Sequence, residues 1–505
     1  PPRTTPKPSS AASDVYNIHI IFYLKKKKKS LIFTINNKYL KTKKKLFTPI
    51  MSEEFGHAFK EKYFSYLDPT ANVINHGSYG TTPAMVIDAQ LKSVKEHELY
   101  PDRYEYKDAP KEYKRQAKLV ADYLGLNWEN LALVQNATSG INVFLRSLPF
   151  DWENDLVILP NTTYGACTNT VKFLHDSYGL KYKFVDLVFP LEPSQILNKF
   201  EQVFKQEVPK YKGKIFCLFD CISSMPGVTM PYEDLIILCK KYNIKQIIDG
   251  AHAPGQVDLQ FLDTLKPDFF TGNLHKWVSV PKSCAIIYVQ KEWHSLIHTQ
   301  PISWTFNLSY DDIEEGKSLL VERFSAVGTI NYSSYFGIET AIHFRRDICG
   351  GEDRIRSYQK DLSLKAFNAM KQIFSVTGNT GDKYDHYEPR LLENKAGTLT
   401  PVGMFSISYP INLSKYSRVY NNLINSPAVY LSKIRGLLEA STIHKYKNYT
   451  PLVLHGDILY FRLSVQVFNE LSDFITAANI NKILLEDVFT KEEDRLANST
   501  NQSKL

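Results

Sequence analysis

The order of apolar and polar positions predicts strands that alternate with helices over residues 75–289. Short unbroken apolar runs are typical of strands buried on both faces, and they lie at residues 131–135, 156–159, 215–219, 246–248 and 285–289. Apolar residues with helical spacing lie between these runs, at Ile141, Phe144, Leu145 and Leu148 and again at Leu235, Leu238, Cys239 and Tyr242. Such alternation predicts an α/β fold with a mostly parallel central sheet and helices on both faces.

The pattern changes after the glycine pair at residues 350–351. A long helical stretch at 353–374 is followed by a polar segment at 377–395 and by short strands at 404–409 and 458–464. This order predicts a smaller C-terminal α+β domain. The boundaries that we expect are a large domain with an N-terminal segment over 51–345, a small domain over 346–490 and a disordered polar tail over 491–505.

Residues 1–50 differ in composition from the rest of the chain. They carry a net charge of +11, against +8 for the whole chain, which leaves −3 for residues 51–505. The body therefore lacks the basic surface that binds nucleic acid or an anionic membrane. Because Met51 precedes an ordinary Ser-Glu-Glu opening, we interpret residues 1–50 as a basic low-complexity extension that is disordered or lies upstream of the natural start. The alternative is a nuclear or organellar targeting segment.

The chain shows no signal for a membrane or a metal. No apolar run reaches the ~20 residues that a membrane-spanning helix needs, so we expect a cytoplasmic protein. The six cysteines form no Cys-x-x-Cys pair and have no histidine spacing typical of zinc sites. They are expected to be reduced and mostly buried thiols.

A lysine and an aspartate mark the candidate chemistry. Lys276 follows an Asn-x-His triplet, and Asp249 ends an apolar run 27 positions upstream. This pair suits a pyridoxal 5′-phosphate (PLP) enzyme, because the amine forms a Schiff base with the cofactor and the carboxylate keeps the pyridine nitrogen protonated. The competing interpretations are a solvated surface lysine and an aspartate that caps the following Gly-Ala turn.

Further candidates lie at the carboxyl ends of predicted strands, where ligands of parallel sheets bind. His252 follows Asp249 and could hydrogen-bond a ring oxygen, although a packed core histidine is the commoner case. Thr138 and Ser139 open a predicted helix, whose free amides and dipole favour a phosphate. Ordinary helix caps use the same residue types.

Two more residues suit the ring and the substrate of such an enzyme. Tyr164, in the loop after residues 156–159, could stack on the pyridine ring, although it could equally pack elsewhere. Arg462 lies within a short predicted strand of the small domain. Its guanidinium group suits bidentate binding of an amino-acid carboxylate, and a surface salt bridge is the competing interpretation.

Taken in order, these motifs resemble the class V aminotransferase family of fold-type I PLP enzymes. The nearest branch is the isopenicillin-N-epimerase-like group, which includes hercynylcysteine sulfoxide lyases. The matching motifs are Asn75-His-Gly-Ser-Tyr-Gly, Asn136-Ala-Thr-Ser, Asp249-Gly-Ala-His, Asn273-Leu-His-Lys, Val327-Gly-Thr and Arg462-Leu-Ser. They span residues 70–470. The resemblance implies a fold-type I PLP-transferase-like fold and a homodimer.

The resemblance also implies a role for each matching residue. The cofactor-binding residues would be Thr138, Ser139, Tyr164, Asp249, His252, His275, Lys276 and Thr329. Among them Lys276 and Asp249 would be catalytic, and Thr329 would reach the phosphate of the other subunit's cofactor. The carboxylate of a small amino-acid substrate would be bound by Asn75 and Arg462.

Three positions depart from the pattern of the branch. Cys221 stands where a histidine is usual, Asn331 where an acid is common, and Ser283 where glycine is usual. The contact that the histidine would make is therefore in doubt, and the core chemistry is unaffected.

The residues limit the reaction without fixing it. No cysteine follows Cys349, so the persulfide-forming cysteine of desulfurases has no counterpart on a late loop. The resemblance favours a C–S lyase that acts by β-elimination on cysteine or a cysteine S-conjugate such as hercynylcysteine sulfoxide. The alternatives are an amino-acid epimerase, an aminotransferase, or a non-catalytic binding protein with the same fold.

Overall fold

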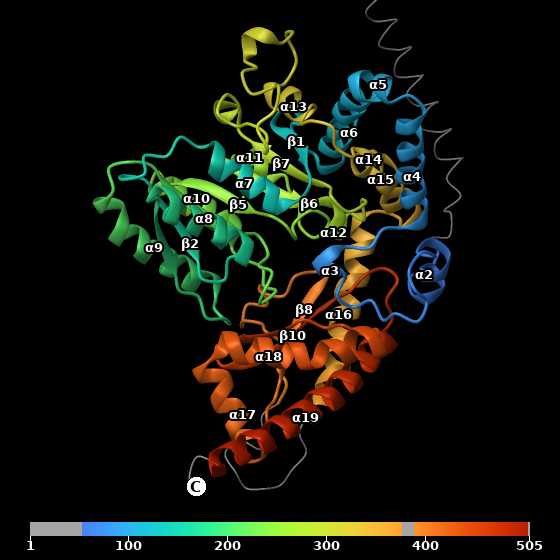
Figure 1. The fold of residues 1–505 in the computed structure, drawn as a ribbon, viewed down its shortest axis with the longest axis vertical. Helices are drawn as coiled ribbons and strands as arrows, with labels where there is room; N and C mark the ends of the chain where they lie inside the picture. Colours follow the sequence, from blue (N-terminus) through green and yellow to red (C-terminus); the bar gives the residue numbers. More distant parts are fainter. Residues whose placement is uncertain (1–52, 376–387, 503–505) are drawn as a thin grey trace, which may run out of the picture. The chain divides into compact units, whose positions relative to one another are not determined.

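The structure is a computed structural model that describes residues 53–375 and 388–502 (Figure 1). Residues 54–505 form one compact unit. The expected extension over residues 1–50, most of the polar segment at 377–395 and residues 503–505 lie outside the described residues. The domain boundaries expected at 345 and 490 stay predictions.

A sheet of seven described strands forms the large domain, in the order β1-β7-β6-β5-β4-β2-β3. Its strands are β1 (Leu131–Val134), β2 (Leu156–Pro160), β3 (Lys181–Val185), β4 (Ile215–Asp220), β5 (Lys245–Asp249), β6 (Phe269–Asn273) and β7 (Ala285–Val289). Strand β7 is antiparallel to both of its neighbours, and the other pairs are parallel. The prediction of a mostly parallel sheet is confirmed.

Helices cover this sheet on both faces (Figure 1). The helices up to residue 343 are α2 (His57–Tyr63), α3 (His76–Tyr79), α4 (Ala84–Leu99), α5 (Pro101–Arg103), α6 (Ala109–Leu124), α7 (Ala137–Ser147), α8 (Gly165–Tyr178), α9 (Pro193–Glu207), α10 (Tyr232–Lys241), α11 (Phe261–Thr264), α12 (Leu274–Trp277), α13 (Leu319–Phe324), α14 (Ser333–Phe336) and α15 (Ile338–His343). Helix α7 packs across β1, β5, β6 and β7, and α10 packs on β4 and β5. The inner strands are buried as their apolar runs require, whereas the edge strand β3 is largely exposed.

The smaller C-terminal domain has a three-stranded antiparallel sheet in the order β8-β10-β9. Its strands are β8 (Met404–Tyr409), β9 (Leu452–His455) and β10 (Ile458–Ser464), and its helices are α16 (Glu352–Phe374), α17 (Leu413–Asn425), α18 (Pro427–Glu439) and α19 (Leu471–Gln502). Gly456 and Asp457 join β9 to β10 with φ of 53° and 62°, as a tight hairpin turn requires. The predicted small α+β domain is confirmed.

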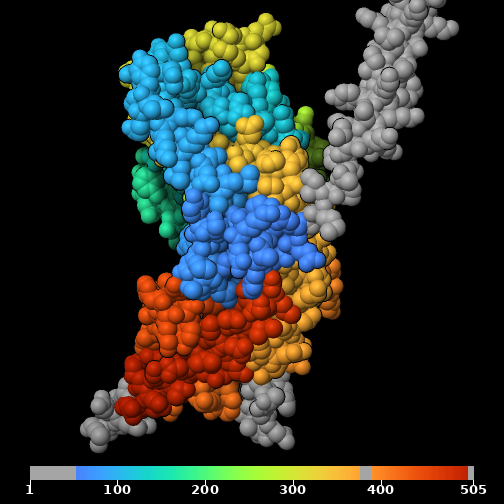
Figure 2. Space-filling model, turned by 90° about the vertical axis from the view of Figure 1, so that its right-hand side faces the viewer, coloured from blue at the N-terminus to red at the C-terminus, as the bar shows by residue number. Residues whose placement is uncertain are grey.

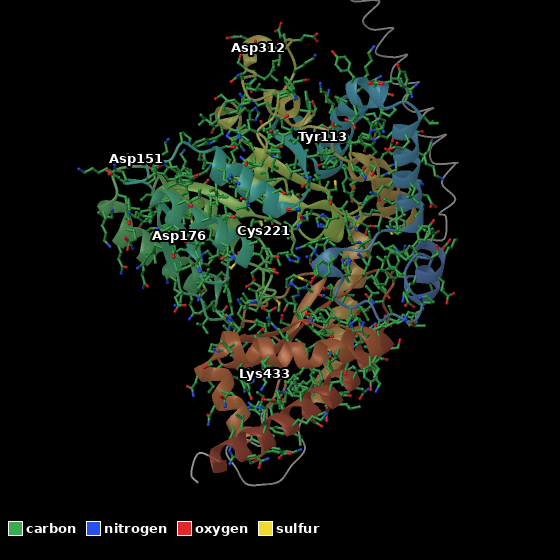
Figure 3. All side chains as sticks on the ribbon, in the orientation of Figure 1. Tyr113, Asp151, Asp176, Cys221, Asp312 and Lys433 are labelled. Atoms are coloured by element: carbon green, nitrogen blue, oxygen red, sulfur yellow. The ribbon has the colours of Figure 1, made fainter. Side chains whose placement is uncertain are left out.

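Residues 491–502 differ from the prediction of a disordered tail over 491–505. Helix α19 continues to Gln502. Glu492 of this helix is buried and pairs with Lys433 of α18 at 2.6 Å and with Arg495 at 3.0 Å, and Figure 3 shows Lys433 on α18. Leu496 packs against the core of the small domain. These contacts order a segment whose composition is polar.

The segment before the sheet connects the two domains. Figure 2 shows this blue segment between the large domain and the red C-terminal helix. The carbonyl of Ile74 accepts from Ser464 N at 2.7 Å, which ties the chain to β10. Gly80 has φ 75°, and a Cβ atom there would lie 1.7 Å from the carbonyl oxygen of His275. Only glycine permits this approach, so α3 lies directly against α12.

Candidate active site

A cavity of about 490 Å³ lies at the carboxyl ends of β4, β5 and β6. These strands end at Asp220, Asp249 and Asn273, and all three residues line the cavity. Lys276 of α12 and Arg462 of β10 also line it. Both domains therefore contribute to one site, at the position where parallel sheets bind ligands.

Lys276 and His252 form the centre of the site. Lys276 Nζ lies 3.1 Å from His252 Nε2, and Trp277 Nε1 donates to His252 Nδ1 at 3.3 Å. Because an indole N–H only donates, a neutral His252 carries its proton on Nε2, and a neutral Lys276 amine accepts it. Burial lowers the pKa of His252 well below its ordinary value. Burial and the charge of Arg462 lower the pKa of Lys276 to about 8, so the amine is a nucleophile close to neutral pH.

Asp249 is held at the end of β5 by two donors. Its Oδ1 accepts from Ala251 N at 2.9 Å, and its Oδ2 accepts from Cys167 Sγ of α8 at 3.3 Å. Burial raises the pKa of Asp249, and Lys276 opposes that rise. Asp220 is its register partner on β4. Burial and the charge of Asp249 raise the pKa of Asp220 well above its ordinary value.

The N-terminus of α7 forms a second part of the wall. Asn136 caps this helix by accepting from Ser139 N at 2.8 Å, and Ser139 Oγ donates to the same oxygen at 3.1 Å. Thr138 lines the cavity, whereas Ser139 is not among its lining residues. A helix N-terminus with a free hydroxyl fits a phosphate. Tyr164 also lines the cavity and is 48% exposed.

His275 also lines the cavity. Its Nδ1 donates to the carbonyl of Cys284 at 2.8 Å, which leaves Nε2 free. Burial lowers the pKa of His275 to about 4. A bound phosphate would supply a negative charge at Nε2, and this charge would favour the protonated, donating form of the ring.

Arg462 is a buried cation without a buried anion. Its side chain is 2% exposed and forms no ion pair with a described residue. Its Nη1 donates to the carbonyl of Ser224 at 2.8 Å, and its Nη2 donates to Asn75 Oδ1 at 3.0 Å and to the Ser78 hydroxyl. Its Nε is buried and has no hydrogen-bond partner. Although burial lowers its pKa to about 10, the group stays charged at neutral pH and fits a carboxylate.

The remaining predicted positions lie outside the cavity lining. Thr329 is exposed. Cys221 is buried inside the large domain, next to Asp220 (Figure 3). Ser283 has φ 71°, a conformation that favours glycine, and Asn331 accepts from Ser333 N at 2.9 Å near the start of α14. The three departures therefore do not alter the cavity wall.

Sequence reasoning missed Asp220 and Cys167. Asp220 ends an apolar run just as Asp249 does, so the same pattern could have marked it. Cys167 lies 82 positions from Asp249, and no spacing rule connects the two residues. Among the described residues, no group of three His, Cys, Asp or Glu side chains could hold a metal ion. No described helix is long and apolar enough to cross a membrane.

Comparison with known proteins agrees with this geometry. The family described as Aminotransferase class-V matches residues 80–387. The chain is 29% identical over 433 residues to the hercynylcysteine sulfoxide lyase of Schizosaccharomyces pombe, covering 85% of this chain and 97% of that protein. It is 24% identical over 438 residues to an L-cysteine desulfhydrase of Arabidopsis thaliana, covering 83% of this chain and 88% of that protein.

A solved structure shares the fold. The cystine C–S lyase C-DES, solved with its reaction product cysteine persulfide, superposes with a TM-score of 0.60 at 14% identity, covering 83% of this chain and 97% of that one. The fold-type I architecture expected from the sequence is confirmed.

Proposed function

Because the chain belongs to the class V aminotransferase family, we propose that it is a PLP-dependent C–S lyase that acts on cysteine or a cysteine S-conjugate. The observation that carries the proposal is one cavity that joins a reactive amine at Lys276, a buried carboxylate at Asp249 and an unpaired guanidinium at Arg462. When bound, PLP supplies an electron sink for charge that develops at the substrate Cα. The relatives named as a hercynylcysteine sulfoxide lyase and a cysteine desulfhydrase support the reaction type.

Five residues of the cavity have assigned roles in this proposal. Lys276 holds the cofactor and, once released from it, takes the proton from the substrate Cα. Asp249 keeps the ring nitrogen protonated, and His252 orients the lysine amine through its Nε2. Arg462 binds the substrate carboxylate, while Asn75 holds the guanidinium in place.

The phosphate of the cofactor fits the wall formed by α7 and α12. The Thr138 hydroxyl and the Nε2 atom of His275 are available there, and the helix dipole favours the negative charge. Ser139 acts through the cap that it forms with Asn136. Tyr164 lies at the edge of the cavity, where its ring can contact the cofactor.

Purified protein incubated with PLP tests the proposal. We expect visible absorption that is absent in Lys276→Ala, together with equal amounts of pyruvate, ammonia and a thiol or sulfenic acid from cysteine S-conjugates. Arg462→Lys should lower kcat/KM about tenfold to a hundredfold, because lysine lacks the planar pair of donors, and should leave the absorption unchanged. Arg418→Lys, on the exposed face of α17, is the matched control.

Two results would contradict this function. A wild-type protein that stays colourless after addition of PLP would exclude the cofactor and favour a non-catalytic binding protein. Inversion of the substrate or amino-group transfer without pyruvate would establish an epimerase or an aminotransferase instead.

We also propose a homodimer in which Thr329 contacts the phosphate of the partner's cofactor. Thr329 is exposed and is not among the residues that line the cavity of its own chain, which supports a role in another subunit. Mixing inactive Lys276→Ala with Thr329→Ala under subunit exchange should restore activity, since one site of each hybrid then carries both residues. Activity that equals the sum of the parent proteins would refute the shared site.

A further inference from the structure

Two carboxyl groups, not one, lie at the position that receives the ring nitrogen. Asp220 and Asp249 are register partners at the ends of β4 and β5. They are 3% and 2% exposed, and both line the cavity. Neighbouring strands lie about 4.8 Å apart, and register partners point to the same face, so the two side chains are neighbours.

The surroundings of the two carboxyls differ. Both oxygens of Asp249 accept hydrogen bonds, one from Ala251 and one from the Cys167 thiol. The carboxyl of Asp220 accepts no hydrogen bond from the side chain or backbone of another described residue, and only its own backbone amide opposes the rise of its pKa as a hydrogen-bond donor. It is therefore a buried polar group aimed into the cavity, and nothing else in the proposed function uses it.

The charges around the pair do not neutralise two carboxylates. The titratable groups that face it are Lys276 of α12, Cys167 of α8 and Cys221 after β4. Burial raises the pKa of both thiols, which keeps them neutral. Lys276 is the one described cation near the pair, and its charge is lost above about pH 8. Two buried carboxyls this close share a proton rather than ionise together.

We propose that Asp220 is a positioning residue that acts through Asp249: in the empty site the two acids hold one proton between them, and the pair would give up this proton to solvent when a cofactor with a protonated ring nitrogen binds. The inference rests on PLP as the cofactor and not on the reaction that follows. The pair loses one proton to solvent, and the positive charge of the ring nitrogen takes over the role of that proton beside the two carboxylates.

Proton uptake during cofactor binding tests this step. PLP is titrated into apoprotein at neutral pH in two buffers of different ionisation enthalpy, and the difference in heat gives the protons taken from solvent. Asp220→Asn should take up about one more proton per cofactor than wild type, because Asp249 alone is ionised. Asp176→Asn, an exposed acid on α8 (Figure 3), should match wild type. Any proton that His275 takes up from solvent when the phosphate binds contributes equally to all three proteins.

Infrared spectroscopy of the wild type gives a reading that needs no variant. The apoprotein should show the carbonyl band of a protonated buried carboxyl, and the band should disappear when PLP binds. Its absence from the wild-type apoprotein would overturn the inference even if Asp220→Asn and Asp220→Ser both fail to fold. Equal proton uptake by wild type and a folded Asp220 variant would overturn it as well. If the wild type binds PLP and becomes coloured, a missing carbonyl band or equal proton uptake refutes only this inference. If the wild type fails to bind PLP, the proposed function is refuted together with this inference.

Discussion

The amine of Lys276 owes its reactivity to burial and to a neighbouring histidine. It has no carboxylate in direct contact, and its described hydrogen-bond partner is His252 at 3.1 Å. Burial removes water that would solvate the ammonium form, and the charge of Arg462 disfavours that form further. Lys276 and Arg462, which we propose to hold the cofactor and the substrate carboxylate, therefore influence each other before either ligand binds.

The rate at which PLP attaches to the apoprotein should follow the neutral fraction of Lys276. Since its pKa is about 8, we expect the rate to rise about tenfold per pH unit below that value and to level above it. Stopped-flow absorption in the visible range measures the rate. A rate that keeps rising towards the ordinary lysine pKa would contradict the burial argument.

At the level of secondary structure, two short helical ends position residues of the site. Helix α7 presents its N-terminus to the cavity, and its cap Asn136 also lines the cavity. Helix α12 carries Lys276 and ends at Trp277, whose carbonyl accepts from Arg345 Nη1. Loss of either support should therefore affect both folding and the cofactor.

Comparing Asn136→Ala with a second cap variant distinguishes loss of helix stability from loss of cofactor binding. Loss of the cap should lower the free energy of unfolding by about 1 kcal/mol and weaken PLP binding, because the amides of α7 lose their fixed direction. The control is Asn412→Ala, which removes an asparagine cap of α17 that accepts from Lys415 N. Asn412→Ala should lower the free energy of unfolding by a similar amount and leave PLP affinity unchanged. Equal loss of PLP affinity in both variants would refute a local effect.

The ion pair between the buried Arg345 and the partly exposed Glu352 should be essential to the support of α12. Arg345 lies in the π-helical turn η6 (Phe344–Ile348), is 2% exposed, and contacts Glu352 at 2.6 Å. Glu352→Gln leaves the guanidinium without a counter-charge and should lower the free energy of unfolding by about 3 kcal/mol. Urea unfolding measures this change.

The neighbouring exposed pair supplies the matched control. Asp347 contacts Arg346 at 2.9 Å with both side chains largely in solvent. Asp347→Asn should lower the free energy of unfolding by less than about 1 kcal/mol. A similar loss in both variants would mean that burial does not distinguish the two pairs.

At the scale of the whole molecule, the sequence predicted those strands and helices that a short-range pattern of apolar residues determines. The unbroken apolar runs correspond to β1, β2, β4, β5 and β7. The edge strand β3 was missed because Lys181–Val185 is largely polar and exposed, which removes the apolar signal. The polar end of α19 was predicted to be disordered because the contacts with α18 that order it join residues distant in sequence.

The residues of the candidate site also divide into those that the sequence pattern predicted and those that only tertiary packing brings there. Lys276, Asp249, His252 and Arg462 belong to short motifs, and the structure brings all four to one cavity. The thiol of Cys167 reaches Asp249 only because α8 packs beside β5. A contact made by tertiary packing leaves no spacing in the sequence, so pattern alone could not predict it.

The thiols test the packing of the whole unit. All six cysteines are free and buried, so a thiol reagent should label them only when the structure opens. We expect no fast reaction in the native protein and six reactive thiols in denaturant. The absorbance of the chromophore that the thiol reagent releases measures the reaction. Rapid labelling of the native protein would contradict the tight packing around β4, α8 and α10.

The unpaired guanidinium of Arg462 has a consequence for how long the empty protein survives. A buried charge whose Nε atom lacks a partner makes the ligand-free state less stable than the same fold with a carboxylate in place. Substrate binding should therefore protect the enzyme against heat and proteolysis, and simple carboxylates that cannot react should protect it in part. Availability of substrate would then regulate the amount of enzyme as well as its rate.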